Sequence, residues 1–292
     1  RSAGLVTAIA VLGWGLWRLT RPEWIFGLST DDHARILAAW AIRDSGLSSS
    51  DVWAPLPTLV TGVGLLAFPF PHVVPGLVNL GWSGLAVYAV ARMAGTKGAV
   101  IAAGLYAGSV WFGWLANSAL AEPPYVAMMA CAGWALRRVE SRGAAWLAVL
   151  PVALAGMCRY EGWAAVVILP AIVLTLPGSR YHIVGQIGVL LAFPVGWMTY
   201  HAVANGDPLG FLRTVLATSA TSDPHVSDLA RVTADITACA GTLILLWVVS
   251  TFFSPPPRPL ARALLLLLGV EMATIAAKFF GAAGVHNGPR NH

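Results

Sequence analysis

The sequence predicts an all-α polytopic membrane protein, with about nine transmembrane helices and two interfacial helices in the first external loop. Of the 292 residues, 57% are hydrophobic and only 11% are charged, whereas soluble domains carry about 25% charged residues. The mean hydropathy is +0.71, and the apolar residues form blocks that approach the roughly 20 residues of a bilayer-crossing helix. These blocks do not alternate in polarity, which favours helices over the strands of a membrane barrel.

Nine apolar blocks are the predicted spans of one transmembrane domain, residues 1–292. The first block could be a signal sequence, but no small-residue cleavage site follows it, so we expect a retained span. Two long polar segments, residues 18–73 and 201–231, are predicted external loops. The predicted spans are residues 4–16, 74–91, 99–115, 124–136, 144–157, 163–176, 183–200, 232–253 and 260–280.

A tenth apolar piece, residues 56–68, ends at Pro69-Phe70-Pro71, where prolines interrupt a helix. It is either a full span or an interfacial helix, and the loop charges favour the interfacial helix. One side of the membrane then receives eight basic residues and a single acid, Glu140. Because Lys and Arg mark cytoplasmic loops, this side and the N-terminus are predicted to be cytoplasmic. The basic residues are Arg92, Lys97, Arg137, Arg138, Arg142, Arg180, Arg258 and Arg262. The acids predicted outside are Glu23, Asp31, Asp32, Asp44, Asp51, Glu122, Glu161, Asp207, Asp223 and Asp228.

Neither the cysteines nor the histidines show a metal-ligand spacing. Cys158 and Cys239 are both predicted near the outer face and could form a disulfide, although packed free thiols are the preferred interpretation. No cofactor is predicted, and a divalent cation held by external carboxylates stays open. The net charge of +5 is explained by cytoplasmic loops, so no nucleic-acid partner is expected.

An acidic pair opens the first predicted interfacial helix. In Ser29-Thr30-Asp31-Asp32-His33-Ala34-Arg35, Ser29 or Thr30 can cap a helix that ends near Ser45. Its apolar stripe would lie on the membrane surface, with both acids just above the bilayer. The acids are equally well explained as first-turn residues that the helix dipole favours.

Two shorter external segments also carry charge. Glu122, followed by Pro123-Pro124, is predicted at the start of a helix, where a carboxylate can also be a simple cap. Cys158-Arg159-Tyr160-Glu161-Gly162-Trp163 is predicted to be a tight turn between apolar blocks. Arg159 is suited to binding a phosphate, although Arg159 and Glu161 could equally be interfacial charges beside aromatic anchors.

Together these pieces resemble the C-type membrane glycosyltransferases, in the branch of polyprenyl-phosphate-sugar-dependent, protein-mannosyltransferase-like enzymes. The resemblance lies in Asp31-Asp32-x-x-Arg35, Ala54-Pro55-Leu56-Pro57, residues 117–122, the Arg159–Gly162 turn and Gly206-Asp207-Pro208-Leu209, in that order. It covers roughly residues 4–211. Family members are usually longer, so the chain resembles a minimal or C-terminally shortened form.

The resemblance implies sugar transfer from a lipid-linked donor to an acceptor hydroxyl on a glycan, lipid or protein at the outer membrane face. It places the catalytic acids at Asp31, Asp32 and Glu122, with Asp31 as the base. The family often has Asp-Glu in place of Asp31-Asp32, which leaves the division between these two open. Arg159 and Arg35 are candidates for binding the donor phosphate, and His33, Tyr160 and Glu161 for contacting sugar or acceptor.

Two other classes of function fit the composition. A transporter or flippase would use ionisable groups near the midplane, for which Glu271 and Lys278 are the candidates. A non-catalytic subunit that binds lipid carriers would keep the apolar groove and Arg159 but would tolerate loss of Asp31 and Asp32. Neither class explains why the acids gather outside, so a transferase is the preferred interpretation.

Overall fold

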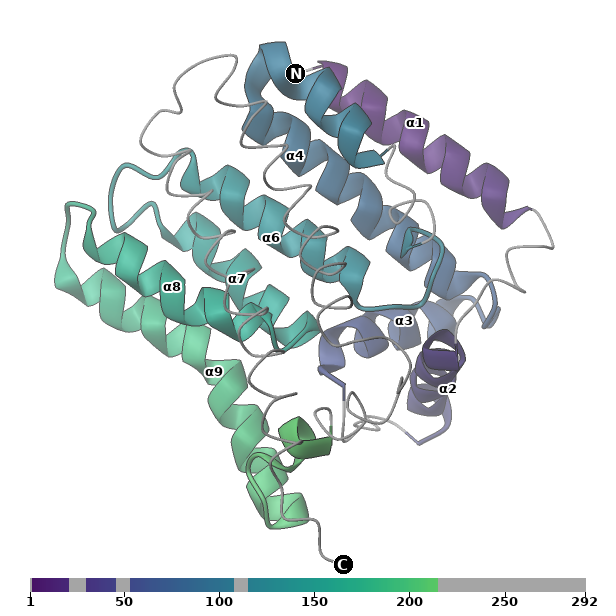
Figure 1. The fold of residues 1–292 in the computed structure, drawn as a ribbon. Helices are drawn as coiled ribbons and strands as arrows, with labels where there is room; N and C mark the ends of the chain where they lie inside the picture. The colour runs from purple at the N-terminus through teal and green to yellow at the C-terminus, as the bar shows by residue number, and fades with distance from the viewer. Residues whose placement is uncertain (1, 21–29, 46–52, 108–114, 215–292) are drawn as a thin grey trace, which may run out of the picture.

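The computed structural model describes residues 2–20, 30–45, 53–107 and 115–214, and every regular element in these ranges is an α-helix (Figure 1). The predicted spans 232–253 and 260–280, Cys239, Glu271 and Lys278 lie outside the described residues. The helices are α1 (Ser2–Leu19), α2 (Thr30–Ser45), α3 (Pro55–Ala67), α4 (Val74–Ala107), α6 (Glu122–Leu136), α7 (Trp146–Cys158), α8 (Gly162–Leu174) and α9 (Arg180–Asn205).

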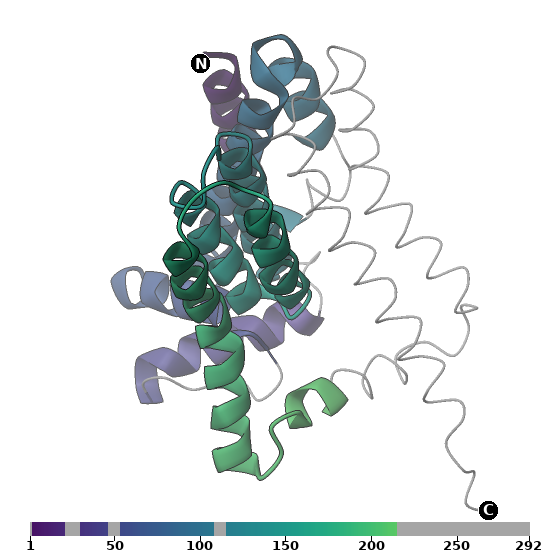
Figure 2. The same cartoon turned by 90° about the vertical axis from the view of Figure 1, so that its left-hand side faces the viewer.

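Helices α1, α4, α6, α7, α8 and α9 pack side by side. α1 packs on α4, α4 on α6 and α6 on α7, and α7 packs against both α8 and α9 (Figure 1). α2 packs on α3, and α3 contacts α4 and α7. Figures 1 and 2 show α2 and α3 across one end of these helices rather than alongside them.

Most predicted segments correspond to one helix each, but one pair does not. The sequence analysis placed a loop at residues 92–98 between two spans, whereas the structure has a single helix, α4, through this region. The predicted loop was wrong, but α4 turns back on itself at its upper end (Figure 1), so the change of direction between the two predicted spans is not contradicted. Arg92 lies within the helix. Its guanidinium lies over the rings of Tyr88 and Trp134, at 5.7 and 5.4 Å from their centroids. A charge shielded by aromatic faces is tolerated within a helix.

Small side chains allow α6, α7 and α8 to approach closely. The core between them contains several alanines with no exposed surface: Ala127, Ala132, Ala148, Ala155 and Ala165. Ala side chains keep helix axes close together, and such packing is typical of helices in membranes, where apolar burial alone does not drive association.

Two described segments have the length and apolar character of a membrane span, residues 74–94 of α4 and the whole of α9. α3, α7 and α8 are apolar but contain only 13 residues each. Several large apolar side chains of α9, among them Val184, Val195 and Val203, are exposed. An exposed apolar surface of this kind marks a lipid or protein contact.

Candidate functional site

Three chain segments that are far apart in sequence meet at the end of the bundle covered by α2 and α3. They are the first turns of α2, the start of α6 and the α7–α8 turn. The guanidinium of Arg159 forms ion pairs with both Glu122 and Glu161. Arg35 is close enough to Glu122, Asp31, Arg159 and Asp32 for each of these charges to influence it. The structure therefore gathers acids and arginines from α2, α6 and the α7–α8 turn.

The α7–α8 turn is tight because glycine permits close contact between its two helices. α7 ends at Cys158, Arg159 is extended, and the backbone N–H of Gly162 donates to the carbonyl of Arg159 at 3.0 Å. A Cβ atom at Gly162 would lie 2.7 Å from the backbone of Ala155, which is closer than real Cβ atoms approach. Glycine at this position lets the turn close and presents Arg159, Tyr160 and Glu161 together.

Arg159 is clamped by carboxylates. Its Nη2 and Nε donate to Glu161 Oε1 and Oε2 at 2.7 and 3.2 Å, and its Nη1 donates to Glu122 Oε1. Burial alone would lower the pKa of Arg159, but the charges of Glu161 and Glu122 outweigh burial, and the pKa is raised. Three of the five N–H groups of this guanidinium are thus already bound to carboxylates within the protein.

Arg35 is in a different state. Its guanidinium lies 4.5 Å from the centroid of the Trp53 ring, and its Nε and Nη1 atoms are buried without a hydrogen-bond partner. Burial lowers the pKa of Arg35 despite the opposing charges of Glu122 and Asp31. Glu122 is in a matching state, because its Oε2 atom is also buried and unpaired. Buried unpaired polar atoms in a native fold call for a specific explanation.

The two acids of the Asp31-Asp32 pair occupy different environments. Asp32 is fully buried, and its Oδ1 accepts a hydrogen bond from the backbone N–H of Ala119 at 2.6 Å. Asp31 is exposed. Asp32 therefore anchors the segment before Glu122, and Asp31 is the acid of the pair that solvent and substrates can reach.

Asn79 is a site-forming residue that the sequence analysis missed. Its Nδ2 donates to the carbonyls of Ser118 and Leu120 at 2.6 and 2.9 Å, so α4 holds the buried segment that leads into Glu122. The signal was present, since Asn79 is an amide within an apolar block. Buried polar groups in such blocks need partners.

Tyr160 belongs to an aromatic cluster that lies beside the charged residues. Its hydroxyl accepts a hydrogen bond from Trp197 Nε1 at 3.1 Å, and its ring lies 4.7 Å from that of Phe211 and 5.5 Å from that of Trp163. Burial raises the pKa of Tyr160 to about 12, against the smaller effects of Trp197 and Arg35. Tyr160 is therefore neutral at physiological pH and acts through packing and its hydroxyl dipole.

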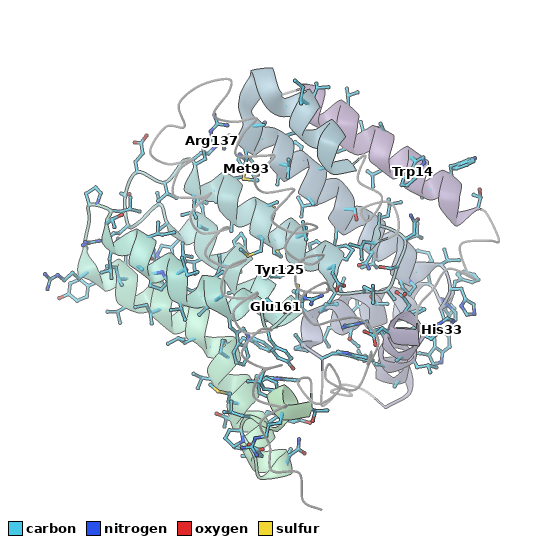
Figure 3. The ribbon with its side chains drawn as sticks, in the orientation of Figure 1. Trp14, His33, Met93, Tyr125, Arg137 and Glu161 are labelled. Atoms are coloured by element: carbon cyan, nitrogen blue, oxygen red, sulfur yellow. The ribbon has the colours of Figure 1, made fainter. Side chains whose placement is uncertain are left out.

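Seven of the eight predicted site residues are gathered at this end of the bundle: Asp31, Asp32, Arg35, Glu122, Arg159, Tyr160 and Glu161. The eighth, His33, is exposed on α2, and Figure 3 shows it well to one side of Glu161 and Tyr125. Tyr125 was not predicted, although it is close enough to Arg159 to influence its charge.

Four carboxylates and two guanidiniums make up the charged part of the site, so its net charge is negative. A negative surrounding stabilises positive charge that develops on a substrate. Within the described ranges, no group of three or more His, Cys, Asp or Glu side chains is arranged to hold a metal ion. No family model, curated protein or solved structure matches this chain.

Proposed function

We propose that this protein is an integral, multi-pass membrane glycosyltransferase that moves a sugar from a polyprenyl-phosphate donor to an acceptor hydroxyl. The observation that carries the proposal is the convergence of Asp31, Arg35, Glu122 and Arg159, from three separate segments, at one end of the helices. This end combines an exposed carboxylate that can act as a base, a guanidinium with unpaired N–H groups that can meet a phosphate, and an excess of negative charge. Such a transfer requires all three features.

The proposed reaction is a displacement at the anomeric carbon. The acceptor oxygen forms a bond to that carbon while its proton passes to Asp31, and the bond from the anomeric carbon to the phosphate oxygen breaks. Polyprenyl phosphate leaves with the bonding electron pair. A positioned carboxylate base contributes about 10²- to 10⁴-fold to such a step. Asp31 suits this role because its carboxylate is exposed, whereas that of Asp32 is committed to Ala119.

Charge complementarity supports the same assignment. Glycosyl transfer passes through an oxocarbenium-like state, which nearby carboxylates stabilise. The departing phosphate gains negative charge, and Arg35 has N–H groups free to meet it. Arg159 acts instead by fixing Glu122, since its own N–H groups bind two carboxylates.

The membrane setting follows from composition and helix character. We place the basic end of the bundle in the cytoplasm with the N-terminus, and the site at the extracytoplasmic face, where the lipid tail of the donor would enter between the helices. The positive-inside tendency supports this orientation. The lipid bilayer and the lipid-linked donor are then the partners, and the acceptor is a glycan, lipid or protein.

The test is transfer from a panel of radiolabelled polyprenyl-phosphate hexoses and pentoses by the purified protein. We expect consumption of at least one donor, with a loss of about 10²- to 10⁴-fold in the Asp31→Asn protein. Glu140→Gln is the matched control, because Glu140 is also an exposed carboxylate but follows α6, at the end opposite Glu122. Undiminished transfer by folded Asp31→Asn protein would remove Asp31 from the base role. Donor binding without consumption would favour a transporter or a carrier-binding subunit.

A further inference from the structure

The unpaired atoms of Arg35 and Glu122 belong to two different helices but to one small region. Arg35 contributes Nε and Nη1 from α2, and Glu122 contributes Oε2 from α6. Glu122 is the charge with the largest effect on Arg35, ahead of Asp31 and Asp32 on its own helix. The hydrogen bond from the Ala119 N–H to Asp32 Oδ1, at 2.6 Å, holds the first turn of α2 against the segment that leads into Glu122. The buried donors of Arg35 and the buried acceptor of Glu122 therefore belong to the same contact region, and neither has a hydrogen-bond partner.

The two side chains do not satisfy each other. Arg35 and Glu122, both within the described part of the chain, form no ion pair, so their nitrogen and oxygen atoms are more than 4.0 Å apart. Glu122 is held at this distance because its Oε1 accepts from Arg159, which Glu161 holds in turn. The clamp therefore prevents Glu122 from turning toward Arg35 and keeps its second oxygen available.

Hydrogen-bond chemistry selects what can bind between the two groups. The bound group must accept from a guanidinium and donate to a carboxylate. A phosphate oxygen can accept but would be repelled by Glu122, and an ammonium can donate but would be repelled by Arg35. A hydroxyl both donates and accepts. The preferred ligand atom is therefore a hydroxyl oxygen.

We infer that Arg35 and Glu122 together bind a hydroxyl group of the transferred sugar, which makes Glu122 a specificity-determining residue. The inference rests on the proposed function, since it takes the sugar of the lipid-linked donor as the source of the hydroxyl. Arg35 can serve phosphate and sugar at once, because a guanidinium has five N–H groups arranged as a fork. The hydroxyl and the phosphate would then lie on neighbouring edges of one side chain.

The experiment measures binding of donors that lack one hydroxyl. The full-length protein in detergent is titrated with bare polyprenyl phosphate, with the polyprenyl-phosphate sugar that it binds best, and with monodeoxy versions of that donor. For the wild-type protein, one monodeoxy donor should bind about 10- to 100-fold more weakly than the intact donor. The missing hydroxyl of that donor would leave the buried charged groups of Arg35 and Glu122 unsatisfied. The others should change little.

Two variants locate the effect. In Glu122→Gln, the preference for the intact donor over the sensitive monodeoxy donor should fall several-fold, since a neutral amide oxygen replaces the charged acceptor of the hydroxyl proton. Glu161→Gln is the matched control: it also removes a carboxylate partner of Arg159, but both Glu161 oxygens bind Arg159, so the preference for the intact donor should persist. Arg35→Lys, which keeps the charge and loses the fork, should also weaken the preference.

Each contrary result has a distinct meaning. A preference that survives unchanged in folded Glu122→Gln protein overturns the inference. Equal binding of all monodeoxy donors by the wild type also overturns it and assigns the space to an ordered water only. If the wild-type protein transfers sugar in either case, the proposed function is retained and only the hydroxyl site is rejected. If it binds no lipid-phosphate sugar, both the function and the hydroxyl site fail.

Discussion

The arginines at one end of the helix bundle have different kinds of partner from the arginines at the other end. After α6, Arg137 donates from Nη1 to the carbonyls of Arg92, at 3.1 Å, and Met93 (Figure 3). Arg138 lies over the ring of Trp134, with its guanidinium carbon 4.9 Å from the ring centroid. At the other end, Arg159 pairs with two carboxylates and Arg35 keeps buried N–H groups unpaired.

The difference lies in whether the charge of the arginine is cancelled. Carbonyl oxygens and aromatic faces satisfy an arginine without cancelling its charge, so the end with Arg137 and Arg138 keeps its positive charge, which agrees with the cytoplasmic orientation that we propose. At the end with Arg35 and Arg159, carboxylates outnumber guanidiniums, and some hydrogen-bonding capacity is left unused. Leaving buried polar atoms unpaired costs stability, and such a cost is typical of binding sites.

The largest expected effect comes from removing the unpaired arginine. Arg35→Met should lower transfer by about 10²- to 10³-fold, as loss of a charge-stabilising donor does in other enzymes. The midpoint of thermal unfolding should be unchanged or higher, because an unpaired buried charge is replaced by an apolar chain. Steady-state transfer and thermal unfolding in detergent measure the two effects. An inactive Arg35→Met protein with a markedly lower midpoint would show that Arg35 is structural.

The next effect concerns the turn that presents Arg159. Gly162→Ala places a Cβ against the Ala155 backbone and should destabilise the fold by about 1–3 kcal/mol. Displacement of Arg159 should also weaken donor binding. Gly196→Ala is the control, since nothing lies within 4 Å of a Cβ at this helical glycine; it should stabilise slightly. Equal thermal unfolding of the two variants would contradict the close-contact argument.

Arg137→Met tests the other half of the comparison. It removes hydrogen bonds to two carbonyls of α4 and should lower the free energy of unfolding by about 1–3 kcal/mol. Transfer per folded molecule should not change, because Arg137 lies at the opposite end of α6 from Glu122. Denaturant unfolding and transfer assays on the same preparation would measure both, and a selective loss of activity would break the distinction between the two ends.

The smallest expected effect is at Tyr160. Tyr160→Phe leaves Trp197 Nε1 without its acceptor and should cost about 1 kcal/mol. The folded-state pKa of about 12 lies above the ordinary value of 10.0, so the folded protein binds the phenolic proton more tightly than the unfolded chain. Stability from this group is therefore complete below about pH 10 and falls as the pH rises toward 12. Across this pH range, the midpoint of thermal unfolding should fall less steeply in Tyr160→Phe than in the wild type. Parallel falls would contradict a raised pKa for Tyr160.

Much of the described fold could be predicted because helix formation and hydropathy are local properties. The blocks that became α1, α6, α7, α8 and α9 were placed from apolar runs, and Pro123 and Pro124 do lie in the first turn of α6. The loop predicted at residues 92–98 is helical in the structure, and the contact between Arg92 and Trp134 could not be predicted because the two residues are distant in sequence. The total of nine spans stays a prediction.

The sequence by itself determined which residues are charged and which of the described segments are apolar helices. Only the tertiary structure decided that Asp32 is buried against Ala119 while Asp31 is exposed, that Asn79 holds the segment before Glu122, and that Arg159 is paired while Arg35 is not. The physical reason is that burial and hydrogen-bond pairing depend on distances between segments that fold together. No property of a single segment contains those distances.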